Sequence, residues 1–277
     1  MVPIKAIDSE RMRGNFTSHA SDYDSYASVQ KRVVDLLVGK LSACEMKPGM
    51  MLDVGTGTGA LAAAIRAMNK EQPLVIMDIA HGMTREAAQR MPGALACDGD
   101  ARKLPFEADS FATVVSSSVY QWVDCLPTAF TEVTRALKPG GWFALALFGE
   151  KTLHELRSSH QRAIARNHKS RTSHVQSFPS CDEVSAAIEQ AGLSCHELHS
   201  TMDVEYHCDV PDLLRQLKQI GASNAAADRP RGLAPRRIMQ SMMQEYECNY
   251  RCDSGLPASY EVIIALAEKP ETAQRRI

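Results

Sequence analysis

The glycine-rich segment at residues 52–59, Leu-Asp-Val-Gly-Thr-Gly-Thr-Gly, constrains the fold of this chain more than any other feature. It overlaps the end of an apolar run at residues 50–54 and precedes a stretch in which Leu61, Ile65 and Met68 recur at helical spacing. Glycine is needed where a turn between a strand and a helix is tight, and where a ligand presses against the backbone. The segment therefore predicts a strand, a ligand-binding turn and a helix in succession.

The chain around this turn alternates between apolar runs and amphipathic stretches. Strands are predicted at residues 50–54, 74–77, 94–97, 111–116, 142–148, 194–205 and 259–267. Helices are predicted after the glycine-rich turn and at residues 27–41, 83–91, 126–137, 151–168, 180–191, 212–220 and 236–250, whereas residues 1–15 are polar and carry no pattern. Such alternation predicts a parallel sheet with helices on both faces.

The composition fits one α/β domain and argues against several classes of function. The 277 residues, 44% of them hydrophobic, can bury one large core. The formal net charge of −2 gives no general attraction to nucleic acid or to an acidic membrane, and no run approaches the about 20 apolar residues of a membrane span. The eight cysteines lack framework or zinc-site spacing, including those in the group Cys195, His196, His199, His207 and Cys208. We expect a cytoplasmic protein without a bound metal.

The charge at the mouth of the turn indicates which ligand it binds. Its glycines are spaced G-x-G-x-G, whereas the dinucleotide-binding fingerprint is G-x-G-x-x-G. Asp53 would repel a pyrophosphate, but it would attract the ammonium and sulfonium groups of S-adenosylmethionine. We therefore predict S-adenosylmethionine as the cofactor.

Further acidic residues follow the next two predicted strands. Asp78 lies where a carboxylate can accept both ribose hydroxyls of an adenosine, although it could instead cap the helix that follows. Asp100 is predicted to accept the adenine amino hydrogens, with Asp98 as a competitor for that role. The predicted cofactor-binding residues are Asp53, Gly55, Thr56, Gly57, Gly59, Asp78, Ile79, Asp100, Ala101 and Ser116.

Four elements together resemble the class I S-adenosylmethionine-dependent methyltransferases. They are Asp53 with its glycines, Asp78, Asp100 before Leu104-Pro105-Phe106, and Leu137-Lys138-Pro139-Gly140-Gly141. The resemblance implies a Rossmann-like α/β fold with a seven-stranded, mostly parallel sheet, in which an antiparallel last strand at 259–267 lies beside 194–205. We expect a single domain over residues 1–277, with an N-terminal helical lid (1–46), a cofactor-binding core (47–150), and lid helices plus the last two strands (151–277).

Segments outside the cofactor site resemble one family more narrowly, the malonyl-acyl-carrier-protein O-methyltransferases of biotin synthesis. The most selective segments are Gln121-Trp122 and residues 217–222, Leu-Lys-Gln-Ile-Gly-Ala, and residues 15–30 and 150–156 continue the likeness. The resemblance implies methylation of the free carboxylate of a malonyl thioester, with malonyl-acyl-carrier protein or malonyl-coenzyme A as the partner. Residues 223–258, rich in Arg and Met, depart from the family and leave carrier specificity open.

This chemistry needs no catalytic base, because a carboxylate with a pKa of about 4 is already ionised at neutral pH. The enzyme has to hold the carboxylate in line behind the methyl group and to exclude water. We therefore predict no catalytic side chain. Candidates for positioning the substrate are Tyr23, Tyr120, Gln121 and Trp122, although Tyr23 and Trp122 could equally pack in the core.

Two basic clusters could bind a substrate carboxylate or an acidic carrier protein. Residues 151–171 contain six Lys and Arg side chains against Glu155 alone, and the predicted partner-binding residues among them are Arg157, Arg162 and Arg166. The second cluster consists of Arg229, Arg231, Arg236 and Arg237. A solvated helix face would explain the same charges.

Two other functions stay open at this point. A methyltransferase for a small free carboxylic acid would need the same cofactor site but no surface for a carrier. A cofactor-binding module without turnover would also keep the glycine-rich turn, although the intact set of Asp53, Asp78 and Asp100 argues against it.

Overall fold

The computed structural model describes residues 7–44, 47–167, 177–222 and 236–271. Its strands are β1 (Met51–Val54), β2 (Leu74–Asp78), β3 (Leu95–Asp98), β4 (Phe111–Ser117), β5 (Leu137–Phe148), β6 (Ser194–His207) and β7 (Leu256–Glu268). Its helices are α1 (Ser9–His19), α2 (Tyr23–Tyr26), α3 (Ser28–Leu41), α4 (Ala60–Met68), α5 (His81–Arg90), α6 (Leu126–Ala136), α7 (His154–Asn167), α8 (Cys181–Gln190), α9 (Val210–Gln219) and α10 (Arg236–Tyr250), with a 3-10 turn, η1, at Tyr120–Trp122. Each predicted strand is present.

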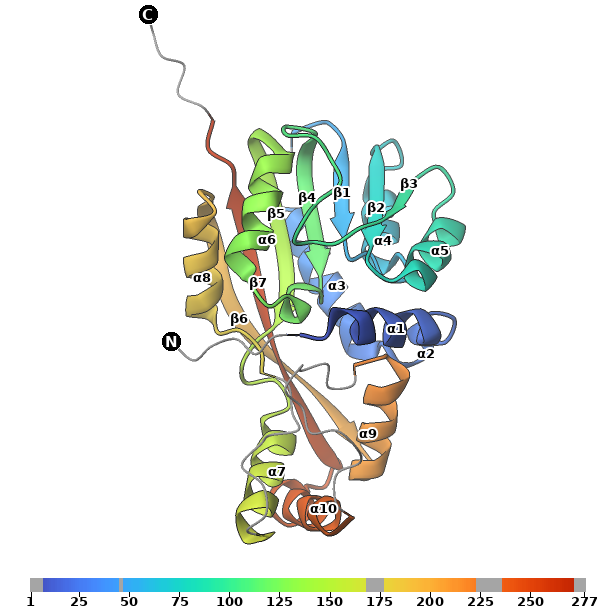
Figure 1. Cartoon of the computed structure of the whole chain (residues 1–277), viewed down its shortest axis with the longest axis vertical. Coiled ribbons are helices and arrows are strands. Elements are labelled where there is room, and N and C mark those ends of the chain that lie inside the picture. Colours follow the sequence, from blue (N-terminus) through green and yellow to red (C-terminus); the bar gives the residue numbers. More distant parts are fainter. Residues whose placement is uncertain (1–6, 45–46, 168–176, 223–235, 272–277) are drawn as a thin grey trace, which may run out of the picture.

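The seven strands form one sheet in the order β3-β2-β1-β4-β5-β7-β6 (Figure 1). Neighbouring strands from β3 to β5 are parallel. In contrast, β7 is antiparallel to both β5 and β6. The predicted seven-stranded, mostly parallel sheet, with its antiparallel last strand beside residues 194–205, is confirmed.

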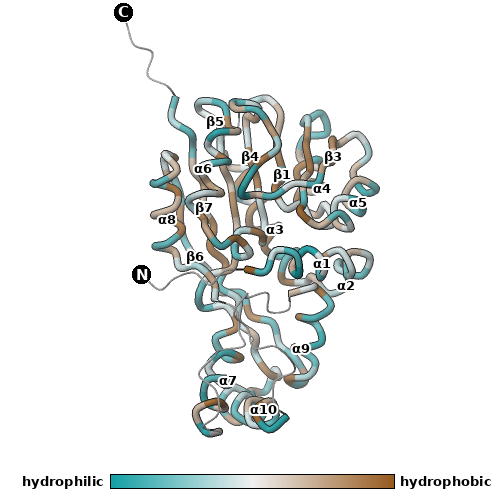
Figure 2. The backbone as a smooth tube through the Cα atoms, viewed as in Figure 1, coloured by the Kyte–Doolittle hydropathy of each residue, from teal (hydrophilic) through white to brown (hydrophobic). Residues whose placement is uncertain are grey.

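Helices cover both faces of this sheet and bury two apolar cores. On one face, α3 and α4 contribute side chains such as Leu37 and Ile65. On the other face, α6 and α8 contribute side chains such as Phe130 and Ile188. Each residue of β1 is buried, as expected of a parallel strand that is covered on both faces. Figure 2 shows hydrophobic residues along the central strands and hydrophilic ones on the outer helices.

The strands β6 and β7 continue past the end of β5 as a two-stranded ribbon. β7 pairs with β5 from Val262 to Glu268, whereas it pairs with β6 from Leu256 onward. We call residues 202–207 and 256–261 the ribbon extension. The helices α7, α9 and α10 surround it and form a lobe beyond the sheet (Figure 1).

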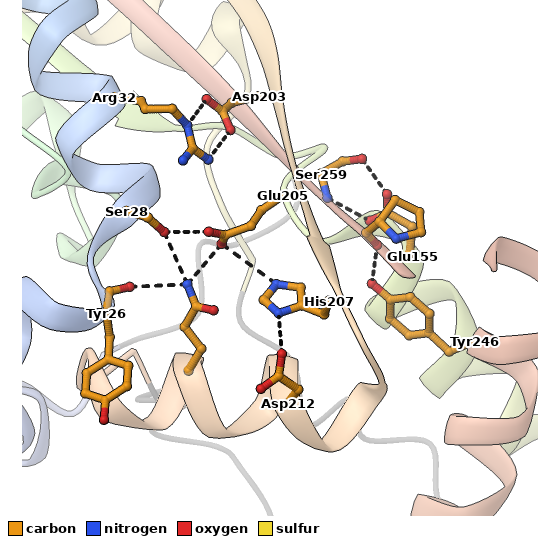
Figure 3. A network of polar contacts seen from close by, with 12 residues as sticks. Tyr26, Ser28, Arg32, Glu155, Asp203, Glu205, His207, Asp212, Tyr246 and Ser259 are labelled. Carbon is orange, nitrogen blue, oxygen red and sulfur yellow. Dashed lines mark hydrogen bonds and ion pairs between the residues drawn. The ribbon is translucent and has the colours of Figure 1, made fainter. Parts of the chain in front are cut away.

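Buried carboxylates attach α7 to the ribbon extension (Figure 3). Glu155 accepts hydrogen bonds from the backbone N–H and the hydroxyl of Ser259. Glu261 accepts a hydrogen bond of 2.8 Å from the backbone N–H of Lys151, just before α7. Because Glu155 and Glu261 are buried, loss of either carboxylate would leave buried donors unpaired. These contacts set the position of α7 against β7.

A second polar network joins the ribbon extension to the core and to α9 (Figure 3). Arg32 on α3 makes a bidentate ion pair with Asp203, with N–O distances of 2.7 and 2.6 Å. Glu205 accepts hydrogen bonds from Ser28 on α3 and, at 3.0 Å, from Gln216 on α9. The network therefore fixes α9 relative to the helix that covers the sheet.

The expectation that residues 1–15 lack a pattern of regular structure is wrong for residues 9–15, which belong to α1. Met12 is its one buried residue, so the helix shows little amphipathic signal. It is stabilised by a cap, in which the Asp8 carboxylate accepts a hydrogen bond of 3.0 Å from the Arg11 N–H. It also packs on α5, where a side chain at Gly82 would collide with the backbone of Thr17. Tertiary contacts, which a local pattern does not report, stabilise this helix.

Candidate active site

A pocket of about 120 Å³ lies at the carboxyl ends of the parallel strands β1, β2 and β4, beneath α1, α2 and α3. This edge of the sheet is where open α/β folds bind their ligands. The predicted cofactor-binding residues that line it are Asp53, Gly55, Thr56, Gly57, Asp78, Ile79 and Ala101. We call it the cofactor pocket.

The glycine-rich turn needs glycine for two separate reasons. Gly55 has a φ of +68°, and a Cβ there would lie 2.2 Å from Cγ2 of Val119. Gly57 has a φ of +56°, but a Cβ at that position would meet no heavy atom within 4 Å. Backbone conformation therefore restricts both positions, whereas steric contact restricts Gly55 alone.

Asp53 is buried in the cofactor pocket with one carboxylate oxygen still available. Its Oδ2 accepts a hydrogen bond of 2.8 Å from the hydroxyl of Thr56. Its Oδ1 is buried and has no hydrogen-bond partner among the described residues. Burial raises the pKa of Asp53 to about 7, and the nearby charge of Asp78 adds to the shift. A buried carboxylate with a free oxygen is stabilised by a cation, so the site suits the ammonium group of S-adenosylmethionine.

Asp78 lines the cofactor pocket and accepts two hydrogen bonds from backbone N–H groups. Its Oδ1 accepts a hydrogen bond of 2.8 Å from the N–H of Ala80, at the start of α5, and its Oδ2 accepts one of 2.9 Å from the N–H of Gly57. Burial raises its pKa to about 6. A carboxylate has about four acceptor positions, so Asp78 can still receive ribose hydroxyls while it joins the glycine-rich turn to α5.

Three predicted cofactor residues, Gly59, Asp100 and Ser116, do not line the pocket. Asp100 pairs with the guanidinium of Arg102 at 2.7 Å; burial would raise its pKa, but the hydrogen bonds from Arg102 hold it below the usual value. The hydroxyl of Ser116 donates a hydrogen bond of 2.8 Å to the Val54 carbonyl inside the core.

Residues adjacent to these predicted ones reach the cofactor pocket instead. Gly99 and Ala101 line it on either side of Asp100, and Ser117 and Ser118 line it beyond Ser116. The competitor Asp98 contacts His81 at 2.8 Å and lies outside the lining. Alternation along β4 could have revealed the shift, because consecutive residues of a strand point to opposite faces of the sheet, so Ser116 and Ser117 cannot both face the ligand.

The N-terminal helices close over the cofactor pocket. Asp24 on α2 accepts a hydrogen bond of 2.6 Å from the hydroxyl of Thr58 and forms an ion pair with Arg90 on α5. Beside it, Tyr23 lines the pocket, and burial followed by the charges of Asp78 and Asp24 raises its pKa. Polar contacts thus hold α2 against both the glycine-rich turn and α5.

A second cavity of about 290 Å³ adjoins the cofactor pocket. The residues that line both are Phe16, Tyr23, Gln30, Ser118 and Trp122. The remaining lining comes mainly from η1, α7, α9, α10 and β7 and the residues next to α7 and α9, with Phe148 of β5 and Phe178, and most of it is apolar. No carboxylate occurs among the described residues that line this second cavity, whereas Asp24, Asp53 and Asp78 all line the cofactor pocket. We call it the acceptor pocket.

The four predicted positioning residues separate into two groups. Tyr23 and Trp122 line both pockets, and Gln121 lines the acceptor pocket. Tyr120 lines neither, because it is fully buried between the rings of Phe130 and Phe143, with centroid distances of 5.1 and 5.7 Å. Tyr120 thus packs in the core, whereas Tyr23 and Trp122 contact apolar neighbours and also line both pockets, so their positioning role stays a prediction.

The predicted partner-binding arginines lie on α7 and line neither pocket. Arg157 donates a hydrogen bond to the Glu150 carbonyl, and burial lowers its pKa. Arg162 lies 5.9 Å from the centroid of the Tyr250 ring. Arg166 forms an ion pair with Glu245. The last two therefore connect α7 to α10. In the second basic cluster, Arg229 and Arg231 lie outside the described residues.

Among the described residues, no group of three or more His, Cys, Asp or Glu side chains could hold a metal ion. In the same part of the chain, no helix is long and apolar enough to cross a membrane.

This chain is similar in sequence to a family model and to individual known proteins. A family model described as "Methyltransferase domain" matches residues 52–145. A malonyl-[acyl-carrier protein] O-methyltransferase of Geobacter sulfurreducens is 39% identical over 95% of this chain and 100% of its own length. One from Methylovorus is 35% identical over 96% of this chain and 90% of its own length. A biotin biosynthesis bifunctional protein of Teredinibacter turnerae is 36% identical over 94% of this chain, which spans 47% of that protein.

Solved structures support the fold. The YcgJ protein of Bacillus subtilis has a TM-score of 0.59, with 17% identity, and covers 87% of this chain and 99% of its own. A geranyl diphosphate methyltransferase has a TM-score of 0.51, with 14% identity, over 85% of this chain and 76% of its own. At these identities the likeness concerns the fold alone.

Proposed function

Because the chain belongs to the malonyl-[acyl-carrier protein] O-methyltransferase family, we propose that it transfers the methyl group of S-adenosylmethionine to the free carboxylate of a malonyl thioester on acyl-carrier protein. The neutral methyl ester would then be used in biotin synthesis, because one relative is named a biotin biosynthesis bifunctional protein. One observation carries the proposal. A pocket with three carboxylates adjoins a pocket without any among its described lining residues, which suits a cationic cofactor beside an anionic acceptor.

The cofactor pocket supports the first half of the proposal. S-adenosylmethionine supplies a methyl group made electrophilic by its bond to a sulfonium. The Oδ1 of Asp53, which lacks a hydrogen-bond partner among the described residues, would bind the ammonium group, and the remaining acceptor capacity of Asp78 would bind the ribose hydroxyls. The glycine-rich turn would let the ligand approach the backbone closely, because Gly55 and Gly57 carry no side chains.

The acceptor pocket supports the second half. The two segments that most distinguish the family in the sequence, Gln121-Trp122 and residues 217–222, lie far apart along the chain. Both line this pocket, through Gln121, Trp122, Leu217, Lys218, Ile220 and Ala222. Family-specific residues that converge on one cavity are best explained by a shared acceptor.

Positioning and exclusion of water suffice for this reaction. A bond forms between a carboxylate oxygen and the methyl carbon while the sulfonium–methyl bond breaks, and no proton moves. Tyr23 and Trp122 line both pockets, so they lie where the two reactants would meet. Phe16 packs edge-to-face on Trp122, with ring centroids 5.5 Å apart, and so places α1 over the boundary between the pockets. Shielding a carboxylate from water makes it more reactive toward a methyl group.

The apolar character of the acceptor pocket favours a thioester over a small free acid. Lys218 and His160 are the basic residues in its described lining, and side chains such as Leu153, Leu156 and Met242 surround them. A free di- or tricarboxylate would bring more than one charge into this apolar cavity, and burial of an unpaired charge is costly. A malonyl thioester brings a single carboxylate, followed by the uncharged thioester and amide groups of the pantetheine arm, whose phosphate lies at its far end.

An acceptor comparison tests the proposal. The purified protein is incubated with S-adenosylmethionine and either malonyl-acyl-carrier protein, malonyl-coenzyme A or free malonate, and methyl esters are measured by mass spectrometry. We expect turnover on the thioesters and at least about tenfold lower kcat/KM on malonate, because truncated substrates lose binding energy. Turnover on free acids alone, or none on any acceptor, would contradict the proposal.

A further inference from the structure

Lys218 differs from every other described residue of the acceptor pocket. It is exposed, whereas the other lining residues are buried or half-buried, so it lies at the open side of the cavity. The other basic residue in the lining, His160, is buried on α7. A pocket with no carboxylate in its described lining and a lysine at its opening attracts an anion.

The fold of α9 explains why Lys218 faces the pocket. Leu217 and Lys218 lie three and four residues after Leu214, so both are neighbours of Leu214 on one side of the helix, and all three line the cavity. Just after the end of α9, Gly221 has a φ of +71°, which allows the N–H groups of Gly221 and Ala222 to reach the carbonyls of Lys218 and Leu217.

The same glycine brings the end of α9 close to the boundary between the pockets. A Cβ at Gly221 would lie 3.2 Å from Cδ1 of Phe16, so only a bare backbone fits there without displacement. Phe16 lines both pockets. Lys218 therefore lies three residues before Gly221, which contacts Phe16 at the boundary between the two pockets. The methyl group would be transferred at this boundary.

The neighbouring cations are already engaged. Arg215, one turn earlier on α9, pairs with Asp212 at 3.1 Å and does not line the pocket. Lys31 lines the cofactor pocket and donates a hydrogen bond to the Asp24 carbonyl. Lys218 has no ion-pair partner among the described residues. Within the described part of the chain, it is thus a cation without a counter-charge at the opening of an apolar cavity.

We propose that Lys218 binds the carboxylate of the malonyl group and thereby selects an anionic acyl thioester, an inference that rests on the function proposed above. Its ammonium would hold one carboxylate oxygen while the other attacks the methyl carbon. The substrate carboxylate carries one negative charge and the methyl ester carries none, so the ion pair is present with the substrate and lost with the product. Lys218 therefore acts as a positioning and specificity residue that also favours release of the product.

Substitution of Lys218 by Met keeps the apolar stem and removes the charge. We expect KM for malonyl-coenzyme A to rise about 10- to 100-fold, as for loss of a charge-assisted hydrogen bond. Binding of S-adenosylmethionine and of the methyl ester product should change less than twofold, and Lys218→Arg should recover part of the affinity. Arg215→Met is the matched control, because it removes an exposed cation from the same helix outside the pocket.

A malonyl thioester of N-acetylcysteamine, which carries no phosphate, separates the two possible anions. A defect of Lys218→Met that persists with this acceptor supports contact with the carboxylate. A defect confined to malonyl-coenzyme A would assign Lys218 to the phosphate of the pantetheine arm and overturn the proposal. Equal defects in Lys218→Met and Arg215→Met, or a lower melting temperature with unchanged KM, would reduce Lys218 to a surface or helix-end charge. If the unmodified protein methylates no malonyl thioester, the proposed function itself fails.

Discussion

The cofactor pocket and the acceptor pocket differ in how they are built. The cofactor pocket takes its carboxylates Asp53 and Asp78 from the ends of adjacent parallel strands, in segments that one glycine-rich turn brings together. The acceptor pocket takes its walls from η1, α7, α9, α10 and β7, which are far apart in the sequence. A pocket for one cofactor needs a fixed local geometry. The shape of the acceptor pocket, in contrast, depends on where α7, α9 and α10 pack around the ribbon extension.

The largest effect is expected where the cofactor pocket tolerates no side chain. Gly55→Ala combines a positive φ with a contact of 2.2 Å to Val119, so the free energy of unfolding should fall by about 3 kcal/mol. Gly57→Ala has a similar φ without the contact and should lose only about 1 kcal/mol. Chemical denaturation measures both. Equal losses in the two variants would mean that backbone strain, and not the contact with Val119, restricts Gly55.

The next effect concerns the ribose. Asp78→Ala should weaken binding of S-adenosylmethionine by about 2 kcal/mol, because charge-assisted hydrogen bonds are lost. Isothermal titration calorimetry measures the affinity, and circular dichroism checks that α5 still forms without the bond to Ala80. Asp98→Ala removes a carboxylate at the adjacent strand end outside the pocket and should leave the affinity within twofold. Unchanged affinity in a folded Asp78 variant would rule out the ribose assignment.

The affinity of the cofactor pocket for S-adenosylmethionine should depend on pH. Burial raises the pKa of Asp53 to about 7 and that of Asp78 to about 6, so both take up protons more readily than in the unfolded chain. A cationic cofactor binds their ionised forms, and its affinity should therefore fall as the pH is lowered from 8 to 5.5, by up to about tenfold per pH unit for each proton.

In the absence of cofactor, the stability of the fold should change with pH in the opposite direction, so that it is higher at low pH. Because the folded state binds more protons than the unfolded state between the ordinary pKa and the raised one, the free energy of unfolding should decrease as the pH rises from about 4 to about 7. Asp53→Asn should flatten both profiles, which calorimetry and thermal melts can record. An affinity for S-adenosylmethionine that does not vary with pH would argue against Asp53 and Asp78 as its counter-charges.

The smallest effect is expected in the lobe. Arg166→Met leaves the buried carboxylate of Glu245 without its ion-pair partner and should lower the free energy of unfolding by about 1 kcal/mol. The double variant with Glu245→Gln should recover most of this loss, and kcat/KM for malonyl-coenzyme A should stay within twofold. A larger loss on malonyl-acyl-carrier protein that shrinks with salt would support the predicted partner role of Arg166. Equal kinetics with both thioesters would leave it a purely structural residue.

The sequence-based prediction was accurate where the pattern is local. The apolar runs of the seven strands are present in the sheet, and Asp53 and Asp78 both line the cofactor pocket. At the strand ends the pocket lining differs from the predicted residues by one position, because Gly99 and the predicted Ala101 flank Asp100 and Ser117 follows Ser116; the cofactor roles of Asp100 and Ser116 stay predictions. At these ends the chain leaves the sheet, so side-chain direction depends on the turn that follows.

Amino-acid spacing alone determined the succession of strands and helices along the chain, the glycine-rich turn and the negative charge of the pocket beside that turn. These properties depend on residues close in sequence, through side-chain periodicity and the conformational freedom of glycine. Only the tertiary structure decided that Tyr120 belongs to the core, that Arg162 and Arg166 contact α10, and that Lys218 opens onto the acceptor pocket. The first assignment depends on the packing of α6 on the sheet, and the other two depend on how α7, α9 and α10 pack around the ribbon extension. Such long-range contacts leave no periodic signal in the sequence.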